Sequence, residues 1–267
     1  MSERNYEALR YTLDPRGVAT VVLDRPEKHN ALNHQLICEL TDVFKRIGRN
    51  PRVRVVVLTG EGGSFSAGGD LKWFAANLEM SRQERQAEGA LLANMLHEIN
   101  YLPKPVIGRI NGPAYGGGIG MLAVCDVSVG VAGARFGLTE VRLGLIAATI
   151  SPHVVRRMGV RNARRTFLSG ALFSADKACA YGLLDEVVAQ DELDDAVERE
   201  VRNHLEAAPQ AVAETKRLID YVSTHAVEDN LQYTAQKLAA AWEAEEGRVG
   251  IGCFLDKQLP PWRSKTP

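Results

Sequence analysis

Hydrophobic and polar residues alternate at the start of the chain and then change to helical spacing. Residues 7–13 and 18–25 alternate on either side of the turn sequence DPRG at 14–17, which predicts a β-hairpin. After a polar loop, apolar residues recur every three or four positions over 36–47, and Asn33 stands where an N-cap would lie. This spacing predicts an amphipathic helix.

Strand-like and helix-like segments then follow one another along the chain. A β-branched run at 53–59 precedes helical spacing at 91–99, and residues 106–111 form another strand-like run. A glycine run at 116–118 opens a short helix, and residues 127–131 are strand-like again. Strands separated by helices after one early hairpin predict an α/β domain with buried parallel strands.

The pattern changes near residue 191, beyond which no strand pattern remains. Helical spacing predicts helices at 191–206, 210–223, 227–245 and 247–257. The third of these carries an apolar stripe that covers either the domain's own core or a neighbouring subunit, and the sequence leaves both open. We therefore expect an α/β core at 1–190 and a helical C-terminal region at 191–267.

Composition and charge narrow the possible functions. The 267 residues are 45% hydrophobic, and 32 basic against 33 acidic side chains leave a formal charge of -1, which gives no electrostatic reason to expect nucleic acid as a partner. Four widely spaced cysteines predict neither a zinc site nor a disulfide framework. The polar N-terminal stretch lacks the apolar region of a secretory signal, so we expect a cytoplasmic protein.

One long apolar stretch, residues 114–134, requires comparison with a membrane span. Its length would be sufficient, and Asp126 is its single charge. The three consecutive glycines at 116–118 are poor helix formers, and a carboxylate in mid-span costs about 2.5 to 3.5 kcal/mol on insertion scales. We interpret this stretch as buried core and expect no membrane association.

Two glycine-rich turns, at 65–71 and 111–118, each follow a predicted strand. Glycine lets a ligand approach main-chain N–H groups, and those groups are unpaired at the start of a helix, where the dipole favours negative charge. Neither turn has the sequence of a phosphate-binding loop. The alternative is that the glycines only permit tight turns and close packing, which we would favour for one such turn but less readily for two.

Glu140 is the candidate acid or base. It follows the strand-like residues 136–138 and precedes an apolar segment, so we expect it to be partly buried. Burial raises a carboxyl pKa toward neutrality and suits the group to proton transfer. The alternative is a structural salt bridge with Arg135 or Arg142, which the local sequence slightly favours.

Several motifs in order along the chain resemble the crotonase superfamily of enoyl-CoA hydratases and isomerases. They are LDRPEKHNALN at 23–33, FSAGGDLKWF at 65–74, LPKPVIGRINGPAYGGGIGMLAVCDVSV at 102–129, ARFGLTEVRLGL at 134–145 and GLLDEVV at 182–188. The resemblance implies a crotonase-like spiral of ββα repeats with a helical C-terminal extension. It also implies assembly as homotrimers or dimers of trimers.

The resemblance further implies an acyl-CoA substrate and no separate cofactor or metal. Two N–H groups, those of Gly69 and Gly117, would bind the thioester oxygen as it becomes an enolate oxygen. Such preorganised donors stabilise developing charge strongly. Glu140 would orient water and pass its proton to C2. The substrate-binding positions that the resemblance implies are Arg25, Ala31, Ala67, Asp70, Leu71, Lys72 and Gly120, although Lys72 could equally be a solvated surface charge.

The chain departs from the family pattern in two places. Hydratases with two carboxylates have a glutamate where this chain has Gly120, so Glu140 is the one acid that remains. Residues 147–153, AATISPH, replace a glycine-rich segment and resemble methylglutaconyl-CoA and isohexenylglutaconyl-CoA hydratase-like proteins. We therefore expect a hydratase for branched acyl chains, with room at Gly120 for a branch.

Two other functions remain open at this stage. A Δ3,Δ2-enoyl-CoA isomerase needs one base, which Glu140 could supply. A non-catalytic acyl-CoA-binding subunit is disfavoured because Glu140 and both glycines are retained. His153, Tyr115 and Asp70 are competing polar groups that are more simply interpreted as packing or hydrogen-bonding residues.

Overall fold

The strands of the computed structural model form a mixed sheet that confirms the predicted hairpin and parallel strands. The structure describes residues 6–263, and the strands of this sheet, in spatial order, are β1 (Leu9–Leu13), β2 (Val18–Leu23), β3 (Val55–Gly60), β4 (Val106–Ile110), β6 (Val127–Val131) and β9 (Glu186–Val188). β1 and β2 pair antiparallel, and each later pair is parallel. Every residue of β3 is buried, as expected for a central parallel strand.

The chain also forms a second sheet, whose strands follow strands of the first sheet along the sequence. Its three strands are β5 (Ala114–Tyr115), β7 (Arg135–Gly137) and β8 (Phe173–Ser174). The chain runs from β4 to β5 and from β6 to β7, and a bridge between Ser66 and Ala114 brings the segment after β3 to the same sheet. A helix follows each passage between the sheets. This repetition confirms the expected spiral of ββα units.

Helices connect the strands and cover the sheets. Those up to residue 205 are α1 (His34–Arg49), α2 (Leu71–Glu79), α3 (Arg82–Asn100), α4 (Gly117–Ala123), α5 (Ser151–Phe167), α6 (Ala175–Ala180) and α7 (Leu193–Leu205), with 3-10 turns η1 (Pro26–Lys28), η2 (Glu140–Leu143) and η3 (Gln190–Glu192). Asn33 caps α1 as predicted, because its side chain accepts a hydrogen bond from the N–H of Leu36 (3.0 Å). The apolar stripe of α1 is buried in the core.

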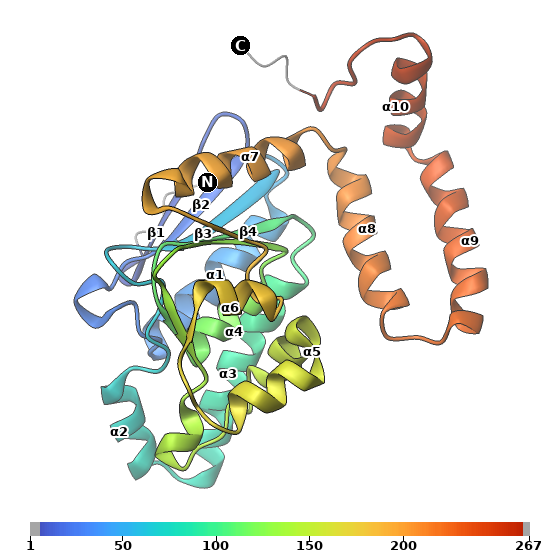
Figure 1. The fold of residues 1–267 in the computed structure, drawn as a ribbon. Helices are drawn as coiled ribbons and strands as arrows, with labels where there is room; N and C mark the ends of the chain where they lie inside the picture. Colours follow the sequence, from blue (N-terminus) through green and yellow to red (C-terminus); the bar gives the residue numbers. More distant parts are fainter. Residues whose placement is uncertain (1–5, 264–267) are drawn as a thin grey trace.

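The helical C-terminal region contains one helix with a buried face and three helices without a buried residue. α7 buries five residues and contacts β3, β4 and β6, whereas no residue of α8 (Pro209–Val222), α9 (Val227–Glu243) or α10 (Glu245–Leu255) is buried. Figure 1 shows these three helices projecting from the core. Buried side chains in this region therefore end at Leu205, within the predicted helical region 191–267. Residues 264–267 of the predicted region, and 1–5 of the polar N-terminal stretch, lie outside the described residues.

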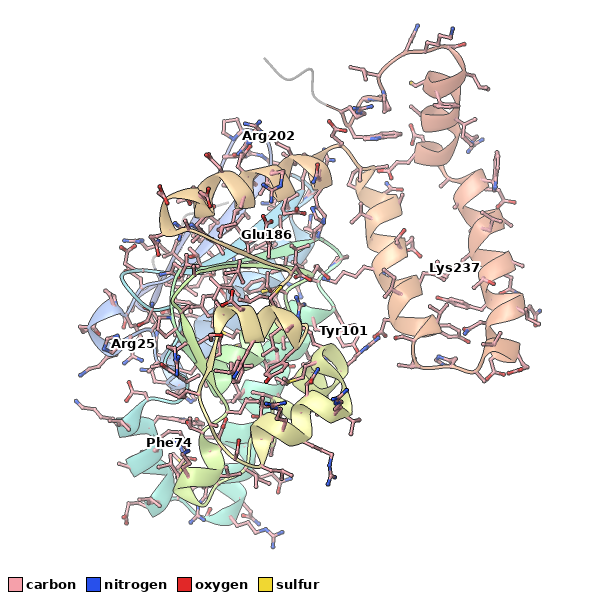
Figure 2. The ribbon with its side chains drawn as sticks, in the orientation of Figure 1. Arg25, Phe74, Tyr101, Glu186, Arg202 and Lys237 are labelled. Carbon is pink, nitrogen blue, oxygen red and sulfur yellow. The ribbon has the colours of Figure 1, made fainter. Side chains whose placement is uncertain are left out.

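The apolar stripe of α9 is uncovered in the single chain. Leu231, Leu238 and Trp242 are 69%, 63% and 60% exposed. On the side toward α8, Lys237 of α9 pairs with Glu214 (3.0 Å; Figure 2). The alternative that the stripe covers the chain's own core is therefore wrong, and cover by a neighbouring subunit stays a prediction.

The long apolar stretch at 114–134 belongs to the core, as predicted. It forms β5, α4 and β6 and ends just before β7, and Gly118 to Ala123 of α4 are buried. Its charge, Asp126, accepts a hydrogen bond from the N–H of Val106 (2.8 Å) and pairs with Lys216 (2.7 Å). Within residues 6–263, no helix is long and apolar enough to cross a membrane.

Asn30 connects the loop after β2 to the loop after β3 through side-chain hydrogen bonds. It is fully buried in the left-handed region, with φ of +53°, which asparagine tolerates better than most residues. Its side-chain oxygen accepts a hydrogen bond from the N–H of Arg25 (3.0 Å), and its Nδ2 donates to the carbonyls of Glu61 and Ser64 (both 2.9 Å). The loop after β3 continues into the glycine-rich turn at 65–71, and the loop after β2 is hydrogen-bonded to that turn through His29 and Leu32.

We expect Asn30→Ala to lower the free energy of unfolding by about 3 kcal/mol, because buried main-chain groups lose their partners and alanine is strained at positive φ. Urea denaturation followed by circular dichroism measures the change. His29→Ala is the matched control, since His29 also has positive φ but is exposed. A loss of less than about 1 kcal/mol for Asn30→Ala, or an equal loss for both variants, would contradict this role.

Candidate active site

The first N–H predicted to face the substrate, that of Gly69, is unpaired within residues 6–263. Leu32 bridges this turn: its N–H donates to the Gly68 carbonyl (2.6 Å), and its carbonyl accepts from the N–H of Asp70 (2.9 Å). In a parallel bridge, the residue that lies between the two bonded residues, here Gly69, directs its own N–H away from the partner strand. The N–H of Gly69 therefore points away from Leu32 and is available to a ligand.

The second predicted N–H, that of Gly117, is also unpaired in the described part of the chain. The N–H of Gly116 donates to the Gly137 carbonyl (3.0 Å), and Gly116 has φ of +45°, which turns the chain into α4. Gly117 is the first residue of α4, and the intrahelical bonding begins with the N–H of Gly120, which donates to the Gly116 carbonyl (3.1 Å). The positive end of the helix dipole lies at this N–H.

The two glycine-rich turns contact each other directly through their backbones. A Cβ added to Gly68 would lie 2.7 Å from the Tyr115 carbonyl oxygen and 3.5 Å from the nitrogen of Gly117. A Cβ on Gly117 would lie 2.7 Å from Cδ1 of Leu32. Close packing therefore requires these glycines, as the alternative interpretation held. The same packing leaves the two N–H donors unused.

Glu140 lies beside the start of α4. It follows β7 as the first residue of η2, and a Cβ on Gly116 would lie 2.9 Å from its Oε1. Its other oxygen, Oε2, is buried and has no hydrogen-bond partner within residues 6–263. Burial raises the pKa of Glu140 above its usual range.

The structural alternative for Glu140 is not observed. Within the described residues, neither Arg135 nor Arg142 forms an ion pair with Glu140. An unpaired, partly buried carboxyl group stands beside the residue that precedes Gly117. Such a group can accept a proton, hold it and return it close to an anion-stabilising donor.

Two of the predicted substrate-binding residues join the loop after β2 to the turn at 65–71. Arg25 forms an ion pair with Asp70 (2.8 Å) and donates a hydrogen bond to the carbonyl of Ala31 (2.5 Å). Asp70 also caps α2 by accepting from the N–H of Lys72 (2.8 Å). Burial alone would raise the pKa of Asp70, but the bonds from Arg25 and Lys72 outweigh it and lower this pKa. The contacts of Arg25, Ala31 and Asp70 with a substrate stay predictions.

The remaining predicted substrate-binding residues lie at the outer side of the same turn. Ala67 is half-buried and its N–H donates to the His29 carbonyl (2.8 Å), whereas Leu71 and Lys72 are exposed at the start of α2. Figure 2 shows Arg25 and Phe74 of α2 at the edge of the core away from α8, α9 and α10. The binding roles of Ala67, Leu71 and Lys72 stay predictions.

The expected room at Gly120 is absent. A Cβ on Gly120 would lie 2.5 Å from Cγ2 of Ile150 and 3.6 Å from Cδ1 of Leu96, and both side chains are buried. Ile150 belongs to the departing segment 147–153. The space that a glutamate would use is therefore filled by this segment, which the sequence alone did not reveal.

The competing titratable residues do not join Glu140. His153 lines a separate cavity with Asp126 and Arg156, and its pKa is lowered by burial and by the nearby His97 and Arg156. Tyr115 has its N–H bonded to the Ser66 carbonyl (3.0 Å). The place of His153 in a separate cavity agrees with its interpretation as a packing residue, and the interpretation of the Tyr115 side chain stays a prediction.

Two aromatic residues near the site were missed from the sequence. The ring of Phe74 packs on Gly69, where a Cβ would lie 2.5 Å from Cζ. Its neighbour Trp73 donates a hydrogen bond from Nε1 to Glu88 of α3 (2.9 Å). Both lie in the motif FSAGGDLKWF, but nothing in local spacing shows that the aromatic ring folds back onto the glycine.

Comparisons with known proteins agree with this geometry. A family model described as enoyl-CoA hydratase/isomerase matches residues 14–265. Enoyl-CoA hydratase ACTT6 of Alternaria alternata is 38% identical, over 91% of this chain and 80% of that protein. Mevalonyl-coenzyme A hydratase sidH of Aspergillus fumigatus is 32% identical, over 92% and 91%. The crystal structure of an enoyl-CoA hydratase from Shewanella pealeana has a TM-score of 0.93 and 34% identity, covering 96% of both chains.

We expect Asp70→Asn to lower the free energy of unfolding by about 3 kcal/mol at pH 7, because Arg25 would keep a largely buried charge without its partner. The asparagine amide oxygen can still accept the capping hydrogen bond of α2, so the substitution removes only the negative charge. The folded-state pKa of Asp70 is lowered, so its contribution is present above the ordinary aspartate pKa of about 3.9 and is lost as the pH falls through the folded-state value.

Urea denaturation at pH 7 and at successively lower pH measures this difference, which should shrink under acid. Asp24→Asn is the control, because Asp24 pairs with Arg10 at 3.5 Å on the surface and should cost less than about 1 kcal/mol. A difference between Asp70→Asn and the unaltered protein that does not change with pH would show that charge is not the cause.

Proposed function

The chain belongs to the enoyl-CoA hydratase/isomerase family and is an enzyme, and we propose that it adds water across the C2=C3 double bond of an enoyl-CoA thioester. The observation that carries this proposal is the partly buried carboxyl group of Glu140, which has no ion-pair partner within residues 6–263 and lies beside the start of α4, where the N–H of Gly117 is likewise without a partner in that range. A second free N–H, from Gly69, belongs to the turn that contacts Gly117.

Charge stabilisation is the first part of the proposed mechanism. As water attacks C3, electrons move through the double bond to the thioester oxygen, which becomes an enolate oxygen. The N–H groups of Gly69 and Gly117 donate hydrogen bonds to that oxygen. Because main-chain donors are held by the fold, little reorganisation is needed as the charge develops. The proposed step requires no cofactor beyond the coenzyme A of the substrate.

Proton transfer is the second part. The water oxygen forms its bond to C3 while Glu140 accepts a proton from the water. Glu140 then returns this proton to C2, and the enolate collapses to the saturated thioester. One carboxyl group is sufficient if both events occur on the same face of the double bond. The raised pKa of Glu140 suits both accepting and returning a proton near neutral pH.

For the acyl group, we propose a branched chain of the methylglutaconyl-CoA type. The departing segment at 147–153 and the name of the Aspergillus fumigatus relative, a mevalonyl-coenzyme A hydratase, support this choice. The branch cannot enter a space at Gly120, since Ile150 fills it. A branch would instead pack against Ile150.

The two alternative functions are less well supported. The relatives named above are hydratases, which favours water addition over isomerisation. A purely binding subunit would have no use for a buried carboxyl oxygen without a partner, which is costly to maintain. We therefore retain hydration as the single proposed reaction.

For assembly and location, we propose a homotrimer or a dimer of trimers in the cytoplasm. The uncovered apolar residues of α9 support association, because such a surface is unfavourable in water. Lys72 and Leu71, exposed beside Asp70, are proposed to meet the coenzyme A part of the substrate. Lys72 is the cation of this pair and would face a phosphate.

We expect Glu140→Gln to lower kcat by about 10²-fold or more while acyl-CoA affinity changes little, because the amide keeps the shape but cannot exchange a proton. Loss of enoyl-thioester absorbance measures turnover. In the unaltered protein, kcat/KM should fall as the pH drops through the raised pKa of Glu140, above the ordinary glutamate range, since the base must be ionised.

The matched control is Glu61→Gln, which changes a carboxyl group on the loop after β3 without touching Gly116. Full turnover by Glu140→Gln, together with loss of turnover in His153→Ala or Tyr115→Phe, would show that another group transfers the proton.

We expect Gly117→Pro to lower kcat by about 10²- to 10³-fold relative to Gly117→Ala, because proline removes the N–H that faces the enolate oxygen. Alanine is the matched control, since its Cβ meets Leu32 as that of proline does while the N–H is kept. Circular dichroism establishes that both variants fold. Equal kcat values for the folded variants would remove Gly117 from the proposed mechanism.

A further inference from the structure

Glu140 and Ile150 both contact the chain around the start of α4. At Gly116, which precedes the helix, Oε1 of Glu140 lies 2.9 Å from an added Cβ. At Gly120, in the first turn of the helix, Cγ2 of Ile150 lies 2.5 Å from an added Cβ. The absence of side chains at both glycines lets these two residues from a later part of the chain reach α4.

Ile150 is held firmly at this position. It is 2% exposed, and its carbonyl accepts hydrogen bonds from the N–H groups of His153 (3.2 Å) and Val154 (3.0 Å) as α5 begins. Leu96 of α3 packs near the same point, 3.6 Å from the added Cβ of Gly120. The isoleucine is therefore a fixed apolar wall rather than a mobile surface residue.

This wall determines what surrounds the carboxyl group. Gly120 has no side chain and Ile150 is apolar, so neither residue gives Glu140 a polar neighbour. The buried Oε2 of Glu140 correspondingly has no partner among the described residues. The two places where the sequence departs from the family pattern, Gly120 and 147–153, are thus one structural feature.

We propose that Ile150 is a specificity-determining residue, whose side chain bounds the site where the C3 substituent of the enoyl thioester lies. This inference rests on the proposed function. If the N–H of Gly117 holds the thioester oxygen, Gly120 lies about 4.5 Å further along α4. C3 is two bonds from the thioester carbonyl carbon, so its substituent extends into this region and meets Ile150.

The chemistry of the wall defines the substituent that it accepts. A methyl or methylene group packs favourably on isoleucine and leucine, whereas a carboxylate placed there would lose its hydration without gaining a partner. The site therefore takes acyl chains with a small apolar group on the C3 side that faces Ile150. Any charged group of the acyl chain points elsewhere.

The test compares kcat/KM for 3-methylcrotonyl-CoA and crotonyl-CoA, which differ by one methyl group on C3, by loss of enoyl-thioester absorbance. We expect Ile150→Ala to lower the ratio of the first to the second by about tenfold or more, because the C3 methyl loses its contact and one methyl group in a fitted pocket is worth about 10- to 200-fold. Ile150→Val should move the ratio in the same direction by less. Gly120→Ala should lower it, because the new Cβ pushes Ile150 toward the substrate.

Ile47→Ala is the matched control, since it removes an equally buried isoleucine from α1. It should lower Tm as Ile150→Ala does but leave the substrate ratio within about twofold of that of the unaltered protein. If Ile150→Ala does not fold, Ile150→Val carries the same test. Unchanged ratios in the folded Ile150 variants would overturn the inference while hydration stands. If the unaltered protein consumes neither these nor other enoyl-CoA thioesters, the proposed function itself fails and the inference with it.

Discussion

Direct backbone contact between two glycine-rich turns is the constraint on which the site depends. Gly68 and Gly117 approach so closely that a Cβ on either would meet Tyr115 or Leu32. Their relative position is therefore set by the strand ends from which they leave the sheets, and not by side-chain rotamers. Other residues are positioned around this contact. The Arg25–Asp70 ion pair holds the turn at 65–71, and Glu140 follows β7 and lies beside the turn at 111–118.

Local patterns in the sequence were sufficient to predict the elements. The hairpin, the Asn33 cap and all four helices beyond residue 191 are present, because each depends on residues a few positions apart. The spiral arrangement and the grouping of Gly69, Gly117 and Glu140 came from the ordered family motifs. Their geometry in the structure agrees with that grouping, while their catalytic roles stay predictions.

Contacts between distant segments could not be predicted from local spacing. Arg25 and Asp70 are 45 residues apart, and their ion pair gives both residues a structural role that local spacing did not show, while their substrate contacts stay predictions. Gly120 suggested open room, but whether a glycine leaves a space depends on what packs there, and Ile150 arrives from another turn of the spiral. Similarly, nothing near Phe74 in the sequence shows that its ring covers Gly69.

Helices α8, α9 and α10 form a unit of local stability separate from the sheets. Because none of their residues is buried in the single chain, opening them exposes little surface that folding had covered. We therefore expect their amide hydrogens to exchange with solvent through local opening, and those of the buried β3 and β4 to exchange more slowly. A second copy bound over these helices raises the free energy of local opening with the logarithm of chain concentration. Hydrogen-exchange protection in this segment thus reports assembly, independently of the stability of the core.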